Sequence, residues 1–175
     1  TFGVLRSTPQ LSDGAETLRV SDQLVSQENW RGIVHLWSLD AKSEIADQDL
    51  VCGSMLHLVQ ALAKTQTQPP RLWLVTRGAQ AVNDEPVLVA QSPLWGFGGV
   101  VALEYPELRC ARVDLSPASD ETEALLAELW SNETENQIAL RREGRYVARL
   151  ARATSEHKRQ PVQLQITNHG TLDNL

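Results

Sequence analysis

A glycine cluster followed by an acidic residue gives this chain the outline of a dinucleotide-binding site. Gly96, Gly98 and Gly99 lie within QSPLWGFGGVVALEYPELRCARVDL, residues 91–115, and Asp114 comes near the end of that segment. In a G-x-G-x-x-G loop the glycines let the backbone approach a pyrophosphate, and an acidic residue about 20 positions later binds a ribose hydroxyl. The spacing therefore makes these four residues a candidate cofactor site.

The same cluster departs from the dinucleotide pattern. The third glycine would fall at position 101, where Val101 has a branched side chain that crowds helix–sheet packing. Trp95 and Phe97 add bulk around the turn, and the preceding strand candidate, residues 87–90, is short. We therefore favour a second interpretation, in which the glycines let a helix pack closely against its neighbours. The site prediction is that the chain holds no catalytic, cofactor-binding or metal-binding residue.

Other arrangements that carry chemistry do not occur in the sequence. A tyrosine with a lysine four positions later would form the proton donor of a short-chain reductase, because the ammonium group lowers the phenol pKa. Tyr105 is followed at that spacing by Arg109, and Tyr146 by Leu150. The sequence has no G-x-S-x-G elbow and no Walker loop. The chain by itself is therefore predicted not to be an enzyme.

Histidine and cysteine spacing argues against a metal site. The four histidines are far apart, and the two cysteines form no C-x-x-C pair. We interpret His35, in a buried-strand pattern, and His57, on a helix, as hydrogen-bonded structural residues. Cys52 and Cys110 are interpreted as buried free thiols in a reducing cytoplasm.

Composition narrows the class of protein further. A chain of 175 residues with 42% hydrophobic side chains suits one domain with a substantial core. The net charge of −6 argues against a nucleic-acid partner, which needs clustered Lys and Arg. No apolar run of about 18 residues exists to span a membrane, and TFGVLRSTPQ lacks a signal-peptide pattern. These features predict a cytoplasmic protein with no membrane or nucleic-acid partner.

The hydrophobic pattern alternates between strands and helices. Buried strands are predicted over residues 32–39 and 71–76, with a helix over residues 49–65 between them and Asp49 as its N-cap. The apolar stripe of that helix consists of Val51, Met55, Leu58, Val59 and Leu62. Strand, helix and strand in this order indicate a parallel pair with a helical crossover.

A second unit of the same kind follows. A helix is predicted over residues 93–104, stopped by Pro106, and a strand over residues 109–115. Asp120, with Glu123 three positions later, predicts the start of another helix. Its inward side chains are predicted to be Leu125, Leu126, Leu129 and Trp130.

The last predicted elements form a hairpin. A strand over residues 138–141, a turn over residues 142–145 and a strand over residues 146–150 complete an antiparallel pair. The fold class is therefore α/β: a mostly parallel sheet flanked by helices, ending in an antiparallel hairpin. The five tryptophans, at positions 30, 37, 73, 95 and 130, are interpreted as packing residues.

Composition changes at both ends of this pattern. Residues 1–152 are assigned to one domain, the polar residues 153–161 to a linker, and residues 162–175 to the start of another domain. Before Gly32 the sequence offers one short strand candidate, residues 17–20. The first strands of the sheet are therefore predicted to be absent or altered.

Several phrases together carry a resemblance to a known family. IVHLWSLD, RLWLVTRGAQAV, SPLWGFGGVVALEYPEL, ARVDLS and IALRREGRYVARLAR, in this order, resemble the structural subdomain of the ketoreductase in modular type I polyketide synthases. The resemblance covers about residues 30–152. It implies a truncated Rossmann-like (pseudo-Rossmann) fold that binds no cofactor. It also implies a catalytic subdomain, later in the same polypeptide, that carries the NADPH site and the Ser, Tyr and Lys residues.

The tail carries a second resemblance. ITNHGTLDNL is similar to the opening of an enoylreductase domain of the medium-chain dehydrogenase type, which fully reducing modules insert between the two ketoreductase halves. The implied parent is a multifunctional synthase with a neighbouring dehydratase and a phosphopantetheine-bearing acyl carrier protein. The expected function is a non-catalytic scaffold. Two alternatives remain open: an NADPH-binding reductase fragment that uses the glycine cluster and Asp114, and a freestanding docking module with exposed tryptophans.

Overall fold

The computed structural model describes residues 2–5, 30–42, 46–64, 69–83 and 85–152. Within them, six strands form one sheet in the order β1-β2-β3-β4-β5-β6. The strands are β1 (Phe2–Leu5), β2 (Gly32–His35), β3 (Arg71–Arg77), β4 (Ala111–Leu115), β5 (Gln137–Arg141) and β6 (Gly144–Val147). The first five run parallel, and β6 pairs antiparallel with β5. The predicted fold class is confirmed.

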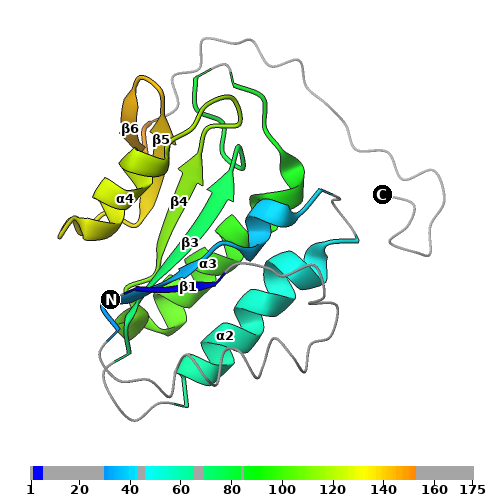
Figure 1. Cartoon of the computed structure of the whole chain (residues 1–175), viewed down its shortest axis with the longest axis vertical. Coiled ribbons are helices and arrows are strands. Elements are labelled where there is room, and N and C mark those ends of the chain that lie inside the picture. Colours follow the sequence, from blue (N-terminus) through cyan, green and yellow to red (C-terminus); the bar gives the residue numbers. More distant parts are fainter. Residues whose placement is uncertain (1, 6–29, 43–45, 65–68, 84, 153–175) are drawn as a thin grey trace.

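Helices cover the two faces of the sheet unequally. In Figure 1, α2 (Ser54–Leu62) and α3 (Ser92–Glu104) lie on one face, and α4 (Thr122–Trp130) lies on the other. The core under α2 and α3 contains Trp37, Met55 and Leu74, whereas the core on the α4 side contains Trp73 and Leu129. The described part of the chain is therefore a three-layer arrangement of helices, sheet and helix.

The position of α4 reverses the hand of one connection. The strand order advances in one direction through β3, β4 and β5, yet α3 and α4 cover opposite faces. The β4–α4–β5 connection therefore has the opposite hand from the β3–α3–β4 connection. Because right-handed crossovers are the rule, this reversal could not be expected from the element order.

Short helical turns replace parts of the predicted strands and helices. The predicted strand over 32–39 is too long, because β2 ends at His35 and a 3₁₀ turn, Trp37–Asp40, continues the apolar run with Trp37 buried in the core. The predicted helix over 49–65 begins as a π turn, Asp49–Gly53, before α2. Its N-cap residue is Gln48, so the assignment of Asp49 as cap is wrong.

The strand candidate at residues 87–90 is also wrong. β3 already has β2 and β4 as its neighbours, so no edge beside it is open to another strand. A 3₁₀ turn, Val89–Gln91, leads into α3 instead. A further 3₁₀ turn, Pro106–Leu108, follows α3, as the proline predicts.

Two errors concern the ends of the sheet. β1 at Phe2–Leu5 was missed, although it pairs in parallel with β2 along its whole length. The last strand is displaced from the predicted 146–150, because β6 begins at Gly144, inside the predicted turn over residues 142–145, and ends at Val147. The strand candidate at residues 17–20, the predicted linker at 153–161 and the predicted domain start at 162–175 lie outside the described residues.

The helix α4 is oriented differently from the prediction. Leu129 is buried, but Leu126 and Trp130 are about half exposed, at 51% and 58%. Buried Glu128 explains this rotation, because its carboxylate binds the guanidinium of Arg145 at 2.6 Å on β6. The predicted capping pair is absent: Asp120 accepts hydrogen bonds from the backbone and hydroxyl of Thr122.

Candidate interface

The glycine cluster lies inside α3 rather than in a loop before it. The helix begins at Ser92, so Gly96, Gly98 and Gly99 occupy its interior and offer no row of free N–H groups to a phosphate. The predicted helix over residues 93–104, which contains these glycines, is confirmed. At Gly98 a Cβ atom would stand 2.6 Å from the side chain of Leu74 on β3. This residue allows α3 to lie close against the sheet.

The second member of the candidate site, Asp114, is engaged by its own chain. Its side chain is fully buried near the end of β4. Oδ1 accepts hydrogen bonds from the hydroxyl of Thr76 at 2.6 Å and the backbone N–H of Ala79 at 2.8 Å. Oδ2 accepts from the backbone N–H of Gln80 and from Arg141, the latter at 2.7 Å. The carboxylate thus orders the loop that follows β3.

Arg141 completes this network at the carboxyl ends of the strands. Its Nε lies 2.5 Å from Glu85 Oε2, and its Nη1 donates to the backbone oxygen of Asp114. Its Nη2 also donates to the backbone oxygen of Gln80. In open α/β sheets ligands bind outside the carboxyl ends of the strands. In this chain, ion pairs and hydrogen bonds between its own residues occupy that position. Arg141 is not among the residues predicted from the sequence, although a charged residue at the end of a buried strand indicates a buried ion pair.

Arg77 holds the same edge together from β3. Its guanidinium donates to the backbone oxygens of Ser116 and Ser119, and its backbone N–H donates to Gln91 Oε1 at 2.8 Å. Leu88 N–H donates to the oxygen of Gly78, which has a positive φ of 63°. The segment between β3 and α3 is thereby folded back against the strand ends.

Histidine and cysteine side chains take structural places in the described residues. His35 is buried, and its Nε2 lies 2.8 Å from Ser54 Oγ, which confirms the expectation of a hydrogen-bonded histidine. Burial lowers the pKa of His35 to about 4. Nδ1 of His57 has no hydrogen-bond partner among the described residues, contrary to the expectation for that nitrogen.

Both cysteines are free thiols, as predicted. Cys110 is buried, and burial raises its pKa to about 12, whereas Cys52 is partly buried. Within the described ranges no three His, Cys, Asp or Glu side chains group as metal ligands. The same ranges contain no helix long and apolar enough to cross a membrane.

The outward face of α3 is apolar up to its last residue, Glu104, which is exposed. Residues 86–103 contain no charged side chain. Pro93, Gly96, Val100 and Leu103, spaced by three or four residues, are exposed on one side of the helix, and we call them the α3 stripe. Leu103 is 82% exposed. Because α3 is apolar on both its inner and outer sides, it has the composition of a helix covered on both sides.

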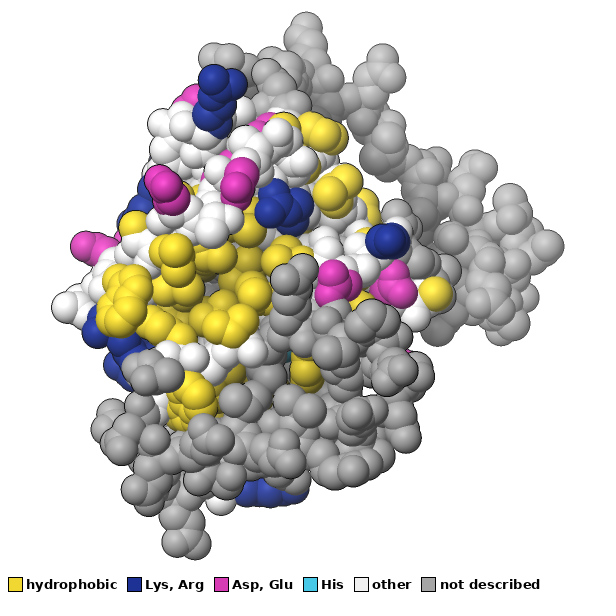
Figure 2. All heavy atoms as spheres, viewed as in Figure 1, with side chains coloured by type: hydrophobic (Ala, Val, Ile, Leu, Met, Phe, Trp, Pro, Cys, Tyr) yellow, Lys and Arg dark blue, Asp and Glu magenta, His cyan; other side chains and the backbone are white. Residues whose placement is uncertain are grey.

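A second apolar area lies on the face that carries α4. Figure 2 shows hydrophobic side chains gathered in the region between α4 and β1 of Figure 1. Exposed members include Val4, Leu126 and Trp130. Trp130 stacks edge to face with Phe2 at 5.2 Å, while Trp37 and Trp73 are buried as expected of packing residues.

Comparison with known proteins assigns this fold. The family model "Polyketide synthase extender module SpnB, Rossmann fold domain" matches residues 6–150. Polyketide synthase GfsA of Streptomyces halstedii is 44% identical over 104 residues, which are 57% of this chain and 1% of that protein. Erythronolide synthase EryA3 of Saccharopolyspora erythraea is 39% identical over 125 residues, covering 68% of this chain and 4% of that protein.

Solved ketoreductases share the fold. The first ketoreductase of the tylosin polyketide synthase superposes with a TM-score of 0.67 and 31% identity, over 84% of this chain and 32% of that structure. A C2-type ketoreductase from a modular polyketide synthase gives 0.67 and 30%, over 82% of this chain and 33% of that structure. This chain thus spans about a third of the ketoreductases and a few per cent of the synthases. It belongs to the Rossmann fold domains of polyketide synthase extender modules and is a fragment of a modular polyketide synthase ketoreductase.

Proposed function

We propose that this chain is the non-catalytic structural subdomain of the ketoreductase. It stabilises an NADPH-binding catalytic subdomain of the same polypeptide, which reduces intermediates attached to an acyl carrier protein. The α3 stripe carries the proposal: an uncharged stripe along a surface helix, with Leu103 82% exposed, needs a partner to cover it. The partner is the remainder of the ketoreductase, because this chain spans only 32% and 33% of two solved ketoreductases.

The occupied strand ends support a role without cofactor. Asp114 receives hydrogen bonds from Thr76, Ala79, Gln80 and Arg141, so a ribose would have to displace several buried partners. Removing those partners leaves buried polar groups unsatisfied, at a cost of about 1–3 kcal/mol each. The chain therefore supports the fold of a reductase rather than its chemistry.

A charge placed on the α3 stripe tests the docking surface. Leu103→Glu should leave the chain folded, because an 82% exposed side chain makes few core contacts. When the variant is mixed with the catalytic subdomain, NADPH-dependent ketone reduction should fall well below the rate obtained with the unmodified chain. Leu126→Glu makes the same change on α4 and should support reduction normally. Equal support by both variants would contradict docking through α3.

Cofactor titration tests the alternative that this chain binds NADPH through the glycine cluster and Asp114. Calorimetry with about 1 mM NADPH should give no saturable heat with this chain, whereas an intact ketoreductase should bind. A dissociation constant in the micromolar range, weakened by Asp114→Asn, would instead support the reductase-fragment alternative.

We extend the proposal to the enoylreductase. If residues 162–175 begin such a domain, the structural subdomain also holds it beside the catalytic half during reductive processing, in a module with a dehydratase and a carrier protein. The resemblance of ITNHGTLDNL supports this step. Reading the next few hundred residues of the parent polypeptide tests it: a nucleotide-binding enoylreductase sequence is expected, and a direct continuation into the catalytic ketoreductase half would exclude it.

A further inference from the structure

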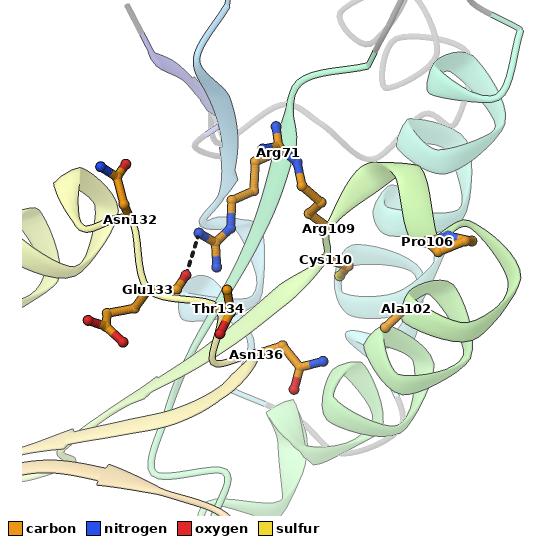
Figure 3. A pocket seen from close by; sticks show the side chains of 9 residues that line it. All are labelled: Arg71, Ala102, Pro106, Arg109, Cys110, Asn132, Glu133, Thr134 and Asn136. Carbon is orange, nitrogen blue, oxygen red and sulfur yellow. Dashed lines mark hydrogen bonds between the residues drawn. The ribbon is translucent and has the colours of Figure 1, made fainter.

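Two adjoining hollows open at the amino ends of the strands, opposite the edge that Arg141 closes. The larger, of about 300 Å³, lies between the starts of β3, β4 and β5 (Figure 3). The smaller, of about 160 Å³, extends toward β1 and α4. Arg71, Arg109 and Asn132 line both. Arg31 lines the smaller one as well.

The arginines around these hollows differ from four others in the described part of the chain, although Arg112, Arg142 and Arg152 likewise have no described carboxylate within 4.0 Å. Arg77, Arg141, Arg145 and Arg149 each lie within 4.0 Å of a carboxylate. Among the described residues, no carboxylate comes that close to the three arginines of the hollows. Arg31 donates to Trp130 O and Asn132 Oδ1, and Arg71 to the backbone oxygens of Glu133 and Glu135. These acceptors satisfy hydrogen bonds but supply no negative charge.

Several contacts fix the orientation of the Arg71 side chain. Its guanidinium lies over the ring of buried Trp73 at 3.9 Å. The hydrogen bonds that it donates to two backbone carbonyl oxygens fix the plane of the group. Figure 3 shows the carboxylate of Glu133 directed away from it, so that only the backbone oxygen of that residue meets the guanidinium. Burial, and then the like charge of Arg109, lower the pKa of Arg71, while the negative charge of Glu128 partly opposes them. A bound anion would relieve that repulsion.

Apart from Glu133 and buried Cys110, the rest of the lining of the larger hollow consists of neutral hydrogen-bond donors and an apolar wall. Asn132, Thr134 and Asn136 provide amide and hydroxyl groups, while Ala102 and Pro106 provide an apolar side. Guanidinium groups bind phosphate oxygens through paired N–H donors, and neutral donors can satisfy the oxygens that remain. We propose that the hollows bind a phosphate ester or pyrophosphate, with Arg31, Arg71 and Arg109 as its cationic ligands. The site is separate from the α3 stripe and does not depend on the docking function.

Pyrophosphate titration of this chain tests the proposal. Saturable binding is expected, and it should raise the melting temperature in proportion to the logarithm of pyrophosphate concentration. Arg109→Gln should weaken binding about tenfold, and the double change Arg31→Gln/Arg109→Gln still further. Arg142→Gln removes the same charge from the exposed hairpin turn and should change the dissociation constant less than about twofold.

Three results would overturn the site. One is the absence of a saturable signal at about 10 mM pyrophosphate in a chain whose circular dichroism shows a folded α/β protein. Another is an equal loss of pyrophosphate affinity in Arg142→Gln, which would show that binding depends only on the net charge of the chain. The third is binding of a polyglutamate peptide with no binding of pyrophosphate, which would make these arginines a docking surface for an acidic protein. Arg109 is exposed, so Arg109→Gln should fold normally, and its affinity can be compared directly with that of the unmodified chain.

Discussion

Gly96 and Gly98 lie two positions apart on α3 and have opposite surroundings. A Cβ at position 98 would meet Leu74 at 2.6 Å and Arg112 at 3.0 Å, whereas at position 96 it would meet nothing within 4 Å. The glycine motif that suggests a cofactor in the sequence therefore contains one residue required by packing inside this chain. Gly96 is required by nothing within the described residues.

Substitution by alanine separates these two glycines. Gly98→Ala should destabilise the chain by about 1–3 kcal/mol, because buried Leu74 and Arg112 must move. Gly96→Ala, the matched control, should be neutral or stabilise by up to about 1 kcal/mol, because alanine favours a helix interior. Urea unfolding monitored by circular dichroism measures both. Equal free energies of unfolding for the two variants would contradict the packing role of Gly98.

The buried histidine makes stability depend on pH. His35 has a pKa lowered to about 4, whereas in the unfolded chain it returns to about 6.5. As the pH falls, the unfolded chain therefore binds a proton at His35 before the folded chain does. The stabilisation present above pH 6.5 is lost as the pH falls toward 4. This one group should remove about 2 kcal/mol between pH 7 and pH 5. Urea unfolding at several pH values measures the loss, and His35→Leu should show less of it. If the free energy of unfolding of that variant changed with pH as steeply as that of the unmodified chain, the pH dependence would come from other groups.

At the scale of elements, the Asp114–Arg141 pair joins β4, β5 and the loop after β3. Both side chains are fully buried, and the pair bridges residues 27 positions apart in the chain. Buried pairs of this kind specify which segments meet, although each charge loses hydration. The pairing explains why a loop without regular structure lies closely over the carboxyl ends of the strands.

Removing one member of this pair should be much worse than removing both. Arg141→Met should cost about 3–5 kcal/mol, because the buried carboxylate of Asp114 loses its countercharge. The double variant Asp114→Asn/Arg141→Met should recover part of that loss. Arg149→Met, which breaks an exposed pair with Glu135, should leave unfolding nearly unchanged. Additive losses in a double-mutant cycle would show that Asp114 and Arg141 do not stabilise each other.

At the scale of the whole molecule, one face of α3 covers the sheet and the other faces outward with no charge before Glu104 at its end. A fragment that spans about a third of solved ketoreductases should leave such a surface for the remaining part. The proposed docking is consistent with the small difference between the polar character of the two sides of α3. Its sequence is typical of a helix between two layers, although the described chain supplies only one of them.

Deletion in the parent module tests the supporting role. Removing residues 30–152 should abolish ketone reduction, because the catalytic half loses the surface against which it folds. Enoylreduction, if that domain is present, should survive at least in part because the domain has its own core. A parent module carrying Arg142→Gln, a change in the exposed hairpin turn away from the α3 stripe, serves as the control with both activities retained. A deleted module that reduces ketones at the normal rate would show that the subdomain supports nothing.

From β2 onward, the sequence by itself determined the order of the main strands and helices, the parallel character of the sheet and the closing hairpin. These features depend on local patterns: buried runs mark β3 and β4, helical spacing marks α2, and Pro106 marks the end of α3. The absence of a Tyr-x-x-x-Lys pair is likewise readable without coordinates. Local hydrophobic periodicity is strong evidence for an element and weak evidence for its boundaries.

Only the tertiary structure decided what the candidate site residues contact. Thr76 and Asp114 are 38 positions apart, and the sequence pattern of either carries no sign of their hydrogen bond. The placement of α4 on the opposite face from α3, the edge strand β1 and the close contact at Gly98 likewise depend on segments meeting across the fold. A motif identifies residue types, whereas long-range packing determines whether their polar groups remain available for a ligand.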